Sequence, residues 1–503
     1  MLSRKRLVFY LFILIVLYQL VSNMLTHTAS KQVIVVGSGL AGLSAAHSVL
    51  QNGQKVIMLE MMPKYGGNSA KASSGINGAP TRYQPVKDDL FYSDTLRSSG
   101  VIYQNSDSQL KKERETLMKT LVDNSQSAVY WLTDHFGIDL AAVTQLGGHS
   151  VPRTHRGTGK IPPGFAIVSE LWKQLEEKYA NLATLRTSCR VTKLITDSQG
   201  VVGVEFEDLD KKHSEKLFGP VIFAVGGFAG DTTGLVTKYR PDLAKFPSTN
   251  SERPQSIGIL EAIGGKLMDM ESIQVHPTGF VDPEDLFSRN KFLAAEMLRG
   301  EGGILLNSLG DRFANEMQRR DQLTEAVMKS CDEELNDEIR QWKVWLVLDE
   351  GSTKNIGSNI GFYQFKKLVA KKKISEWKQE IPNIKESVKR YAQMVQDEKD
   401  TDYGRISLGK WTLKPEEVTD DTELIAGRVT PVLHFTMGGV KINPEAQFLN
   451  IDDQPINGIW GAGEITSGVH SSNRLGGSSL LECVVFGRIA GDHAAKYLAQ
   501  SHI

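Results

Sequence analysis

Residues 32–60 read QVIVVGSGLAGLSAAHSVLQNGQKVIMLE, and this stretch decides the fold. The run VIVVG is typical of a short buried strand, and LAGLSAAHSVLQNG is typical of a helix closed by Gly53. KVIMLE is a second apolar run, which ends at Glu60. A strand, a helix and a strand in this order open a doubly wound parallel sheet, so we predict an α/β fold.

The turn between the first strand and the helix carries the glycine pattern G-x-G-x-x-G. Gly37 permits the tight turn, Gly39 lets a pyrophosphate approach the backbone, and Gly42 lets the helix pack on the strand. The helix N-terminus offers N–H groups to phosphates, and Glu60 stands where a carboxylate accepts hydrogen bonds from ribose hydroxyls. The alternative is a tight turn without a ligand. The complete unit favours a dinucleotide site made of Gly37, Ser38, Gly39, Leu40, Ala41, Gly42 and Glu60.

Length and composition limit the remaining possibilities. A chain of 503 residues is too long for one ordinary core, so we expect two or three domains. The net charge of −1, without a basic stripe, predicts no nucleic-acid partner. Cys189, Cys331 and Cys483 are widely separated and form no CxxC, so we predict no metal, iron–sulfur or c-type haem site.

The N-terminus has a separate character. Arg4, Lys5 and Arg6 precede the apolar run LVFYLFILIVLYQLV, which predicts a signal peptide or membrane anchor over residues 1–30. No clear A-x-A cleavage site follows, so an uncleaved anchor is favoured over a cleaved signal. The other reading is a buried helix of the fold. Basic residues on the cytoplasmic side place the rest of the chain in the lumen of the secretory pathway.

Several motifs along the chain, taken in order, resemble the soluble fumarate reductase family, especially its fungal members. That family is related to the flavoprotein subunits of succinate dehydrogenase, and the resemblance covers roughly residues 31–500. The motifs that carry it are GSGLAGLSAA, GGNSAKASSGING, GGHSVPRTHR, QVHPTGF, RGEGGILLN, HFTMGG and NRLGGSSLLECVVFG.

The resemblance implies an FAD-binding Rossmann-like domain with an inserted α+β capping domain. The FAD domain would comprise residues 31–270 and 434–503, and the cap residues 271–433. Succinate dehydrogenase flavoproteins attach FAD to a histidine after the first strand–helix–strand unit, but no histidine lies between His47 and His135, so we expect non-covalent FAD. Further FAD contacts are expected from Gly67, Asn68, Ser69, Ser74, Gly75, Val191, Gly463, Glu464, Ser478, Ser479 and Leu480.

The family's substrate, a dicarboxylate, binds where the two domains meet. Reduction of fumarate places a hydride on one alkene carbon and a proton on the other, and negative charge grows on a carboxylate. Preorganised cations should therefore supply much of the catalysis. The resemblance assigns substrate binding to His276, His434 and Arg474. Each of these residues taken alone reads more simply as a core histidine or a surface arginine.

The proton donor is the next expectation. The resemblance implies that Arg320 is the acid and that Glu296 and Arg299 feed protons to it; these two are an i,i+3 pair on one helical face. An arginine normally stays charged because its pKa is above ~12, so a histidine is the more ordinary acid. The alternative reading of Glu296 and Arg299 is a plain pair on a helix surface.

Two positions depart from the family pattern. Bacterial relatives commonly carry threonine immediately before the relay glutamate, where this sequence has Ala295. One hydroxyl contact to the substrate is therefore missing or replaced by water. The family's T-G-D-G turn before the cap is altered, because ERPQSIGIL stands at residues 252–260. This change places a flavin-side contact in doubt.

Other activities remain to be weighed. An L-aspartate oxidase-like flavin dehydrogenase is the rival hardest to exclude by motif, and a catalytically silent flavin-binding protein is another. Ketosteroid dehydrogenases use tyrosine chemistry and an apolar cleft, which the arginine and histidine set argues against. We expect reduced flavin or NADH as electron donor and favour free reduced FAD or FMN. We expect an endoplasmic reticulum location, with the mitochondrion as alternative, because fungal relatives occupy both.

Overall fold

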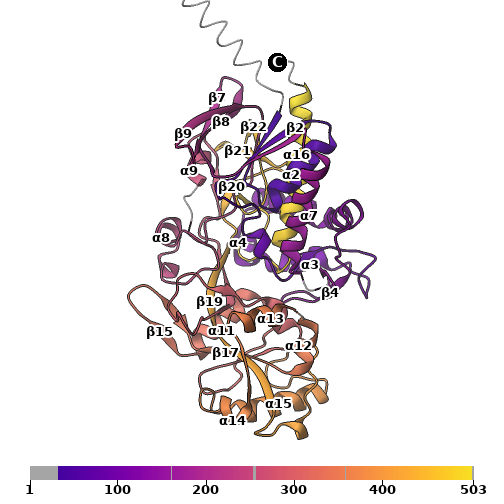
Figure 1. Cartoon of the computed structure of the whole chain (residues 1–503), viewed down its shortest axis with the longest axis vertical. Helices are drawn as coiled ribbons and strands as arrows, with labels where there is room; N and C mark the ends of the chain where they lie inside the picture. Colours follow the sequence, from indigo (N-terminus) through magenta and orange to yellow (C-terminus); the bar gives the residue numbers. More distant parts are fainter. Residues whose placement is uncertain (1–31, 160, 253–255, 357, 501–503) are drawn as a thin grey trace, which may run out of the picture.

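A computed structural model describes the chain except residues 1–31, 160, 253–255, 357 and 501–503 (Figure 1). The predicted N-terminal signal or anchor lies outside the described residues. Over the part that is described, no helix is long and apolar enough to cross a membrane. The described chain forms two bodies along its long axis, one built from its first and last parts and one from the middle of the sequence (Figure 1).

The opening strand–helix–strand prediction is confirmed. β1 (Gln32–Val36) pairs in parallel with β2 (Lys55–Leu59), and α2 (Leu40–Gln51) connects them. β1 lies inside a six-stranded sheet of order β21-β22-β10-β1-β2-β6, in which only β21 is antiparallel. The other strands of this sheet are β6 (Ala183–Arg186), β10 (Val221–Phe223), β21 (Gln447–Leu449) and β22 (Pro455–Gly461).

The C-terminal helix explains why the last part of the chain returns to the first domain. α16 (Ser478–Gln500) lies along α2, as the yellow and indigo helices show in Figure 1. The two helices approach closely because α16 has glycines at the contact. A Cβ on Gly487 would lie 2.6 Å from the Ala41 oxygen, and one on Gly491 would lie 2.5 Å from the Ala45 oxygen. Only glycine fits at this spacing.

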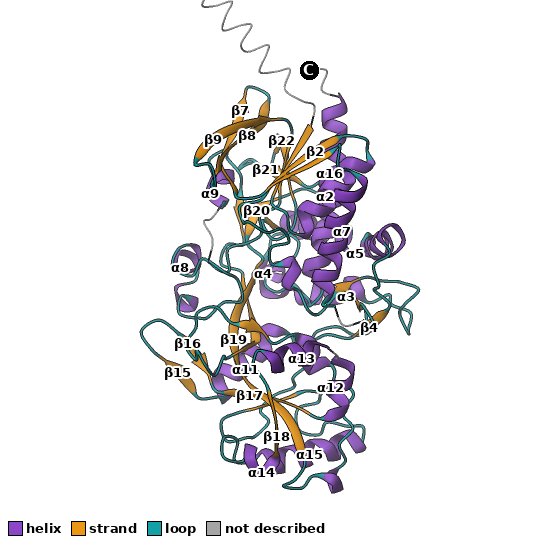
Figure 2. Ribbon diagram, viewed as in Figure 1, coloured by secondary structure: helices purple, strands orange, loops and turns teal. Residues whose placement is uncertain are grey.

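Smaller elements complete the first domain (Figure 2). Its helices include α5 (Ser108–Asp123), α6 (Ser125–Tyr130) and α7 (Pro163–Lys178). An antiparallel sheet of β7 (Cys189–Asp197), β8 (Gly200–Asp208) and β9 (His213–Phe218) lies on one side. The remaining elements are α3 (Phe91–Ser98), α4 (Gly100–Asn105), β3 (Ile76–Asn77), β4 (Ala142–Thr144), β5 (Thr154–Arg156), α8 (Leu235–Tyr239), α9 (Ile257–Glu261), β11 (Leu267–Met268), β20 (Gly439–Lys441) and β23 (Thr466–Ser467).

The middle of the chain builds a second sheet, of order β13-β12-β19-β17-β14, with β18 beside β19. β19 (Glu423–Thr436) crosses the boundary expected at residue 434, so His434 still lies in the cap's longest strand. The strands are β12 (Ile273–Phe280), β13 (Phe292–Leu293), β14 (Ile304–Leu306), β17 (Val344–Leu348) and β18 (Ala370–Lys373). The helices around them are α10 (Glu296–Gly300), α11 (Arg320–Ser330), α12 (Glu350–Ile356), α13 (Ser358–Phe365), α14 (Ile374–Trp377) and α15 (Ile384–Gln396).

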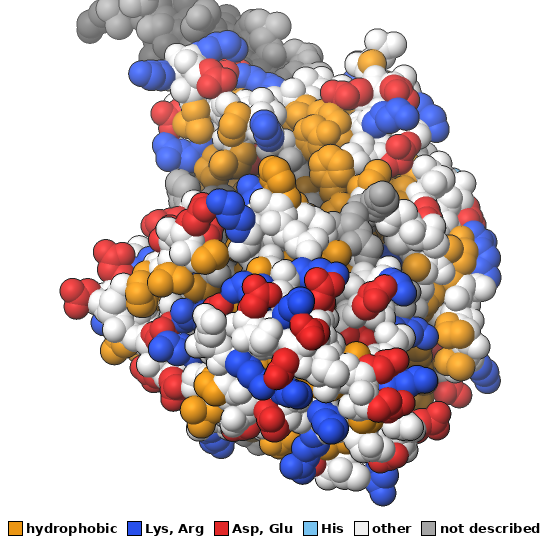
Figure 3. Space-filling view, turned by 60° about the horizontal axis from the view of Figure 1, so that its bottom comes forward, with side chains coloured by type: hydrophobic (Ala, Val, Ile, Leu, Met, Phe, Trp, Pro, Cys, Tyr) orange, Lys and Arg blue, Asp and Glu red, His pale blue; other side chains and the backbone are white. Residues whose placement is uncertain are grey.

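Residues 310–425 combine helices α11 to α15 with strands. The strands are β17, β18 and the hairpin of β15 (Glu333–Leu335) and β16 (Arg340–Trp342). The run KKLVAKKK, residues 366–373, buries Leu368 and Val369 and then pairs with β19 as an edge strand. Its lysines cover the exposed side of that edge, which is a common protection against edge-to-edge pairing. On the face in Figure 3, basic and acidic side chains are interspersed, without a single-sign field.

Candidate active site

One cavity of about 740 Å³ follows the end of β1 and reaches the junction with the cap. Gly42 and Ser478 lie outside its lining: Gly42 packs against the turn, and the Ser478 hydroxyl accepts a hydrogen bond from Asn77 at 2.9 Å. The predicted dinucleotide contacts that do line it are Gly37, Ser38, Gly39, Leu40, Ala41, Glu60, Gly67, Asn68, Ser69, Ser74, Gly75, Val191, Gly463, Glu464, Ser479 and Leu480.

The glycine turn has the geometry that a dinucleotide requires. Gly37 adopts a φ of +100°, and a Cβ on Gly42 would lie 2.0 Å from the Gly37 oxygen, so helix and strand touch there. At Gly39 an added Cβ would meet nothing closer than the Ser69 hydroxyl at 3.5 Å. The first and third glycines therefore serve the turn and the packing, whereas the second leaves the cavity open for a ligand.

Glu60 ends the second strand beside this turn. Its Oε2 accepts hydrogen bonds from the Ser38 N–H at 3.0 Å and the Ser38 hydroxyl at 2.6 Å, and Oε1 accepts from the Met62 N–H at 2.8 Å. The carboxylate also lines the cavity. These contacts fix the carboxylate where a ribose would lie, so the residues present fit an adenine dinucleotide such as FAD.

Four basic side chains gather at the inner end of the cavity. Arg320 starts α11, Arg474 precedes α16, and His434 lies near the end of β19; all three line the cavity. His276 lies on β12 behind His434, with the ring centroids 5.4 Å apart. The structure therefore brings together side chains from both bodies, although they are up to 198 residues apart in the sequence (474 − 276).

A β-bulge in the cap sheet sets the orientation of the His434 side chain. Gln274 pairs with Phe435 and Val275 pairs with Leu433, so His434 is one extra residue in β19. Such a β-bulge bends the strand and redirects a side chain, and bulges are over-represented beside active sites. The two histidines meet at this bulge, which explains how neighbouring strands present both to one point.

Arg320 has two buried partners. Its Nε and Nη2 donate to Glu296 Oε2 at 2.8 and 2.5 Å, and its Nη1 donates to Gln274 Oε1 at 2.7 Å. Gln274 Oε1 also accepts from Arg474 Nη2 at 3.0 Å. Sequence reasoning missed Gln274. The signal was its place two residues before His276, because alternate residues of a strand share a face.

The proposed relay residues are in the cap interior. Glu296 and Arg299 are each 1% exposed, so the reading of a helix-surface pair is wrong. Arg299 Nη1 donates to the backbone oxygen of Glu316 at 2.5 Å, and Arg299 Nη2 has no hydrogen-bond partner among the described residues. The two residues are neighbours on α10, but the hydrogen bonds of Glu296 go to Arg320 and to the Gly147 N–H.

Some buried polar atoms at the junction lack partners. Within the described part of the chain, His276 Nε2 and Arg474 Nε form no hydrogen bond, although both side chains are buried. Nearly all buried polar groups in native proteins are paired, so unpaired ones require an explanation. Their grouping with Arg320 and His434 indicates a site for an anionic ligand.

Burial and mutual repulsion change the protonation of these groups. Burial lowers the pKa of His276 and His434 well below 6.5, and Arg320 lowers both further. Burial, followed by Arg320, also lowers the pKa of Arg474 to about 9. Burial alone would raise the pKa of Glu296, but Arg320 and Arg299 reverse this and lower it to about 2. At neutral pH the cluster therefore holds neutral histidines and an ionised glutamate.

A half-buried carboxyl lies on the flavin side of the junction. Glu464 Oε1 accepts hydrogen bonds from the Thr436 N–H at 2.9 Å and the Thr436 hydroxyl at 3.2 Å. Burial raises the pKa of Glu464 to about 7.

The structure describes only one of the two departures from the family pattern in full. Ala295 is buried at the start of α10, whereas residues 253–255 of the altered turn lie outside the described residues.

Comparison with known proteins supports this arrangement. The family described as FAD binding domain matches residues 32–480. Fumarate reductase 1 of Saccharomyces cerevisiae is 41% identical over 92% of this chain and 98% of its own length. The fumarate reductase of Schizosaccharomyces pombe is 38% identical over 94% and 91%. The chain belongs to the FAD-binding fumarate reductase family.

A solved member of this family has the same fold. The open conformation of a flavocytochrome c3 fumarate reductase superposes with a TM-score of 0.70 over 94% of this chain and 79% of the other, at 28% identity. The predicted FAD domain with an inserted cap is therefore confirmed as the fold. The protein is an FAD-dependent oxidoreductase that acts on CH–CH groups, as predicted.

Proposed function

We propose that this member of the family is a fumarate reductase that forms succinate. The observation that carries the proposal is the cluster of Arg320, Arg474, His276 and His434 at the FAD cavity, in which Arg474 Nε is a buried donor without a partner among the described residues. A small dianion satisfies such a cluster, whereas a neutral substrate would leave it unpaired. The two fungal relatives that bear the name fumarate reductase match this chain almost end to end.

The chain's residues divide between binding and proton transfer. Arg474 and His434 bind the two carboxylates, and neutral His434 can donate from Nε2 because its Nδ1 can accept from the Thr249 hydroxyl. His276 Nδ1 donates to the Thr278 oxygen at 2.8 Å, so in the neutral ring Nε2 is an acceptor, and His276 is placed beside the substrate without donating to it. Gln274 holds Arg474 and Arg320 together against their mutual repulsion, because its single amide oxygen accepts from both. The cap and the FAD domain each supply part of this set, so the complete site exists only where the two domains meet.

Arg320 is the proton donor in this proposal. FAD, when bound and reduced, would supply a hydride to one alkene carbon of fumarate, and the proton must reach the other carbon from the protein. His276 and His434 are poor candidates because their pKa values lie well below 6.5, so they carry no extra proton at pH 7. Glu296 accepts two hydrogen bonds from Arg320. After Arg320 has protonated the substrate, Glu296 would pass a new proton to Arg320, and Arg299 would in turn supply Glu296.

The electron donor is proposed to be a free reduced flavin, with NADH as the alternative. The cavity lining includes Phe165, Phe292 and Phe362, which are 50%, 41% and 46% exposed. Exposed aromatic rings at a cavity suit stacking of a planar carrier.

FAD itself is proposed to be non-covalent, and acid precipitation tests this because it would release a non-covalent flavin. An N-terminal anchor and an endoplasmic reticulum or mitochondrial location are also proposals, tested by fractionation of tagged protein.

One anaerobic assay tests the function. The purified full chain, loaded with FAD, is supplied with reduced methyl viologen and fumarate, and products are identified by mass spectrometry. We expect catalytic formation of succinate. A parallel incubation with L-aspartate and oxidised enzyme tests the oxidase alternative. Bound FAD without succinate formation would contradict the proposal, and turnover of L-aspartate alone would replace it.

A further inference from the structure

The motif GGHSVPRTHR has no role in the reaction as described so far. Its first part belongs to a loop of residues 145–153, called here the bracing loop, which precedes β5 in the first domain. Although the loop is part of that domain, it hydrogen-bonds the cap. The Gly147 N–H donates to Glu296 Oε1 at 2.7 Å, and the Gly148 N–H donates to the Met317 oxygen at 3.3 Å.

The loop approaches the relay carboxylate too closely for a side chain. A Cβ on Gly147 would lie 2.8 Å from Glu296 Oε1 and 2.8 Å from the Gln318 oxygen. Glu296 therefore has one oxygen held by a backbone donor of the first domain and the other held by Arg320. A backbone N–H on one oxygen fixes the plane of the carboxylate, so the other oxygen faces the guanidinium.

His149 contacts the surroundings of Glu296 at a second place, the backbone of Gly476. Arg153 Nη1 lies 2.8 Å from His149 Nδ1, and a guanidinium can only donate, so Nδ1 is unprotonated. The imidazole proton is therefore on Nε2, which donates to the Gly476 oxygen at 3.1 Å. Gly476 lies against the reacting groups: a Cβ there would be 3.0 Å from Glu296 Oε2 and 3.1 Å from Arg320 Nη2.

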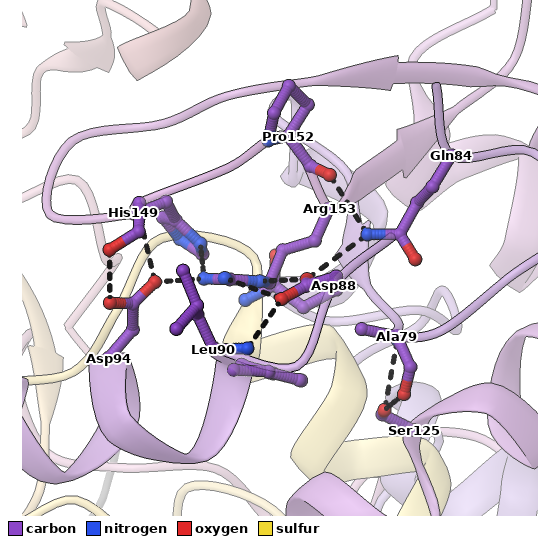
Figure 4. A network of polar contacts seen from close by, with 12 residues as sticks. Ala79, Gln84, Asp88, Leu90, Asp94, Ser125, His149, Pro152 and Arg153 are labelled. Atoms are coloured by element: carbon purple, nitrogen blue, oxygen red, sulfur yellow. Dashed lines mark hydrogen bonds and ion pairs between the residues drawn. The ribbon is translucent and has the colours of Figure 1, made fainter. Parts of the chain in front are cut away.

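The loop is anchored from behind by a buried ionic network (Figure 4). Arg153 is 0% exposed and donates to Asp88 at 2.6 and 3.1 Å and to Asp94 at 2.7 Å. Asp94 also accepts from the Ser150 N–H at 2.8 Å and the Ser150 hydroxyl at 2.7 Å. A buried charge network that is fully paired rigidifies its surroundings, so the loop has one defined position.

We propose that the bracing loop positions the proton relay, and that His149 is the positioning residue that sets the loop against both Glu296 and the Gly476 peptide. Neither His149 nor Gly147 touches substrate in this account; they act through Glu296 and Arg320. The catalytic part of the inference rests on the proposed function, whereas the structural part does not. The experiments therefore include one readout that needs no substrate.

Hydrogen exchange tests the structural part on the full chain loaded with FAD. In His149→Ala we expect exchange at least about threefold faster than wild type in peptides covering both residues 145–150 and residues 294–301, because weakened contacts open more often. Glu296→Ala should accelerate exchange in the loop peptide. The matched control is His47→Ala, which removes another buried histidine bonded to a backbone oxygen, at 2.8 Å, but in α2. Unchanged exchange in the cap peptide of His149→Ala would overturn the proposal.

Kinetics test the catalytic part. We expect His149→Ala to slow fumarate-driven reoxidation of the reduced enzyme by about tenfold to about a hundredfold, the effect of misplacing a catalytic group, with little change in the fumarate concentration needed for half the maximal rate. His149→Gln, which keeps an N–H donor, should recover most of the rate. His47→Ala should reoxidise at the wild-type rate per bound FAD.

A double-mutant cycle separates positioning from general damage. If His149 acts through Glu296, His149→Ala should slow the Glu296→Gln enzyme by no more than about twofold. If His149→Ala slows the Glu296→Gln enzyme by the same factor as it slows the wild type, the catalytic role of the loop would be overturned. A wild-type enzyme that never oxidises its flavin with fumarate would contradict the proposed function instead, while the exchange result would still decide whether the loop holds the cap.

Discussion

Arg320 and Arg474 show, at the residue scale, how two cations are kept close without collapse of the site. One amide oxygen of Gln274 accepts from both, and Glu296 balances the charge of Arg320. The cost of burying these charges is met by ionic hydrogen bonds, yet His276 Nε2 and Arg474 Nε remain without partners among the described residues. A bound dicarboxylate would accept a hydrogen bond from Arg474 Nε.

Replacing Arg320 with lysine tests the importance of its shape. Lysine keeps the charge but is a point donor, so it cannot contact Glu296 and Gln274 through three nitrogens at once. We expect Arg320→Lys to reduce succinate formation by about 10²- to 10⁴-fold while FAD content stays normal. Arg319→Lys is the matched control, because Arg319 is adjacent and pairs with partly exposed Asp321. Equal activity of both variants would refute the role of Arg320.

The residues of the site differ in how well the sequence predicts them. His276, His434, Arg320 and Arg474 are identified from the sequence because their positions match those of the family's site residues. Gln274 was missed because an amide in a strand resembles an ordinary polar residue. The backbone donor at Gly147 could not be predicted either, since a peptide N–H leaves no trace in the side-chain pattern.

At the scale of elements, the pairing of β12 with β19 builds the substrate side of the site. The register shifts twice, between Gln274 and Val275 and between His276 and Gly279, so the paired strands bend at the histidines. A bulge depends on the partner strand and is not visible in the sequence of one segment. For the same reason, the lysine run of β18 does not by itself predict an edge strand.

Gly279→Ala probes this pairing. The backbone at Gly279 is outside the left-handed region, but an added Cβ would lie 2.4 and 2.9 Å from the two methyl carbons of Val432. We expect a loss of about 1–3 kcal/mol in the free energy of unfolding, measured with denaturant. Val432→Ala removes those methyl groups, so the double variant should be more stable than the sum of the single effects. Strict additivity would show that the two side chains do not clash.

At the scale of the whole molecule, buried histidines make stability depend on pH. Burial lowers the pKa of His47, His149 and His155 to about 4, and lowers that of His276 and His434 well below 6.5. Between the folded and unfolded pKa values the unfolded chain binds more protons, so stability present above pH ~6.5 is lost as the pH falls toward 4. Glu464, with its pKa raised to about 7, opposes this trend between pH ~4.5 and 7.

Five histidines have lowered pKa values and only Glu464 opposes them, so the histidines decide whether stability rises or falls with pH. Each group contributes about 1.4 kcal/mol per pH unit, and the free energy of unfolding should therefore be lower at pH 5.5 than at pH 7.5. Denaturant titrations of the FAD-loaded protein at both pH values measure this difference. His47→Gln should reduce the slope of the free energy of unfolding against pH by the contribution of about one proton. Equal or greater stability at pH 5.5 would show that these histidines are not held neutral.

The proposed reaction requires that reduced FAD passes its electrons to fumarate in a cationic site whose proton arrives through Glu296 and Arg320. The most direct measurement is a single anaerobic turnover, in which the wild type and Glu296→Gln are photoreduced, mixed with fumarate, and followed by flavin absorbance and succinate content. We predict one succinate per flavin in the wild type, and reoxidation about 10²-fold slower or more in Glu296→Gln. A wild-type flavin that stays reduced, or a variant that reoxidises at the wild-type rate, would contradict the account.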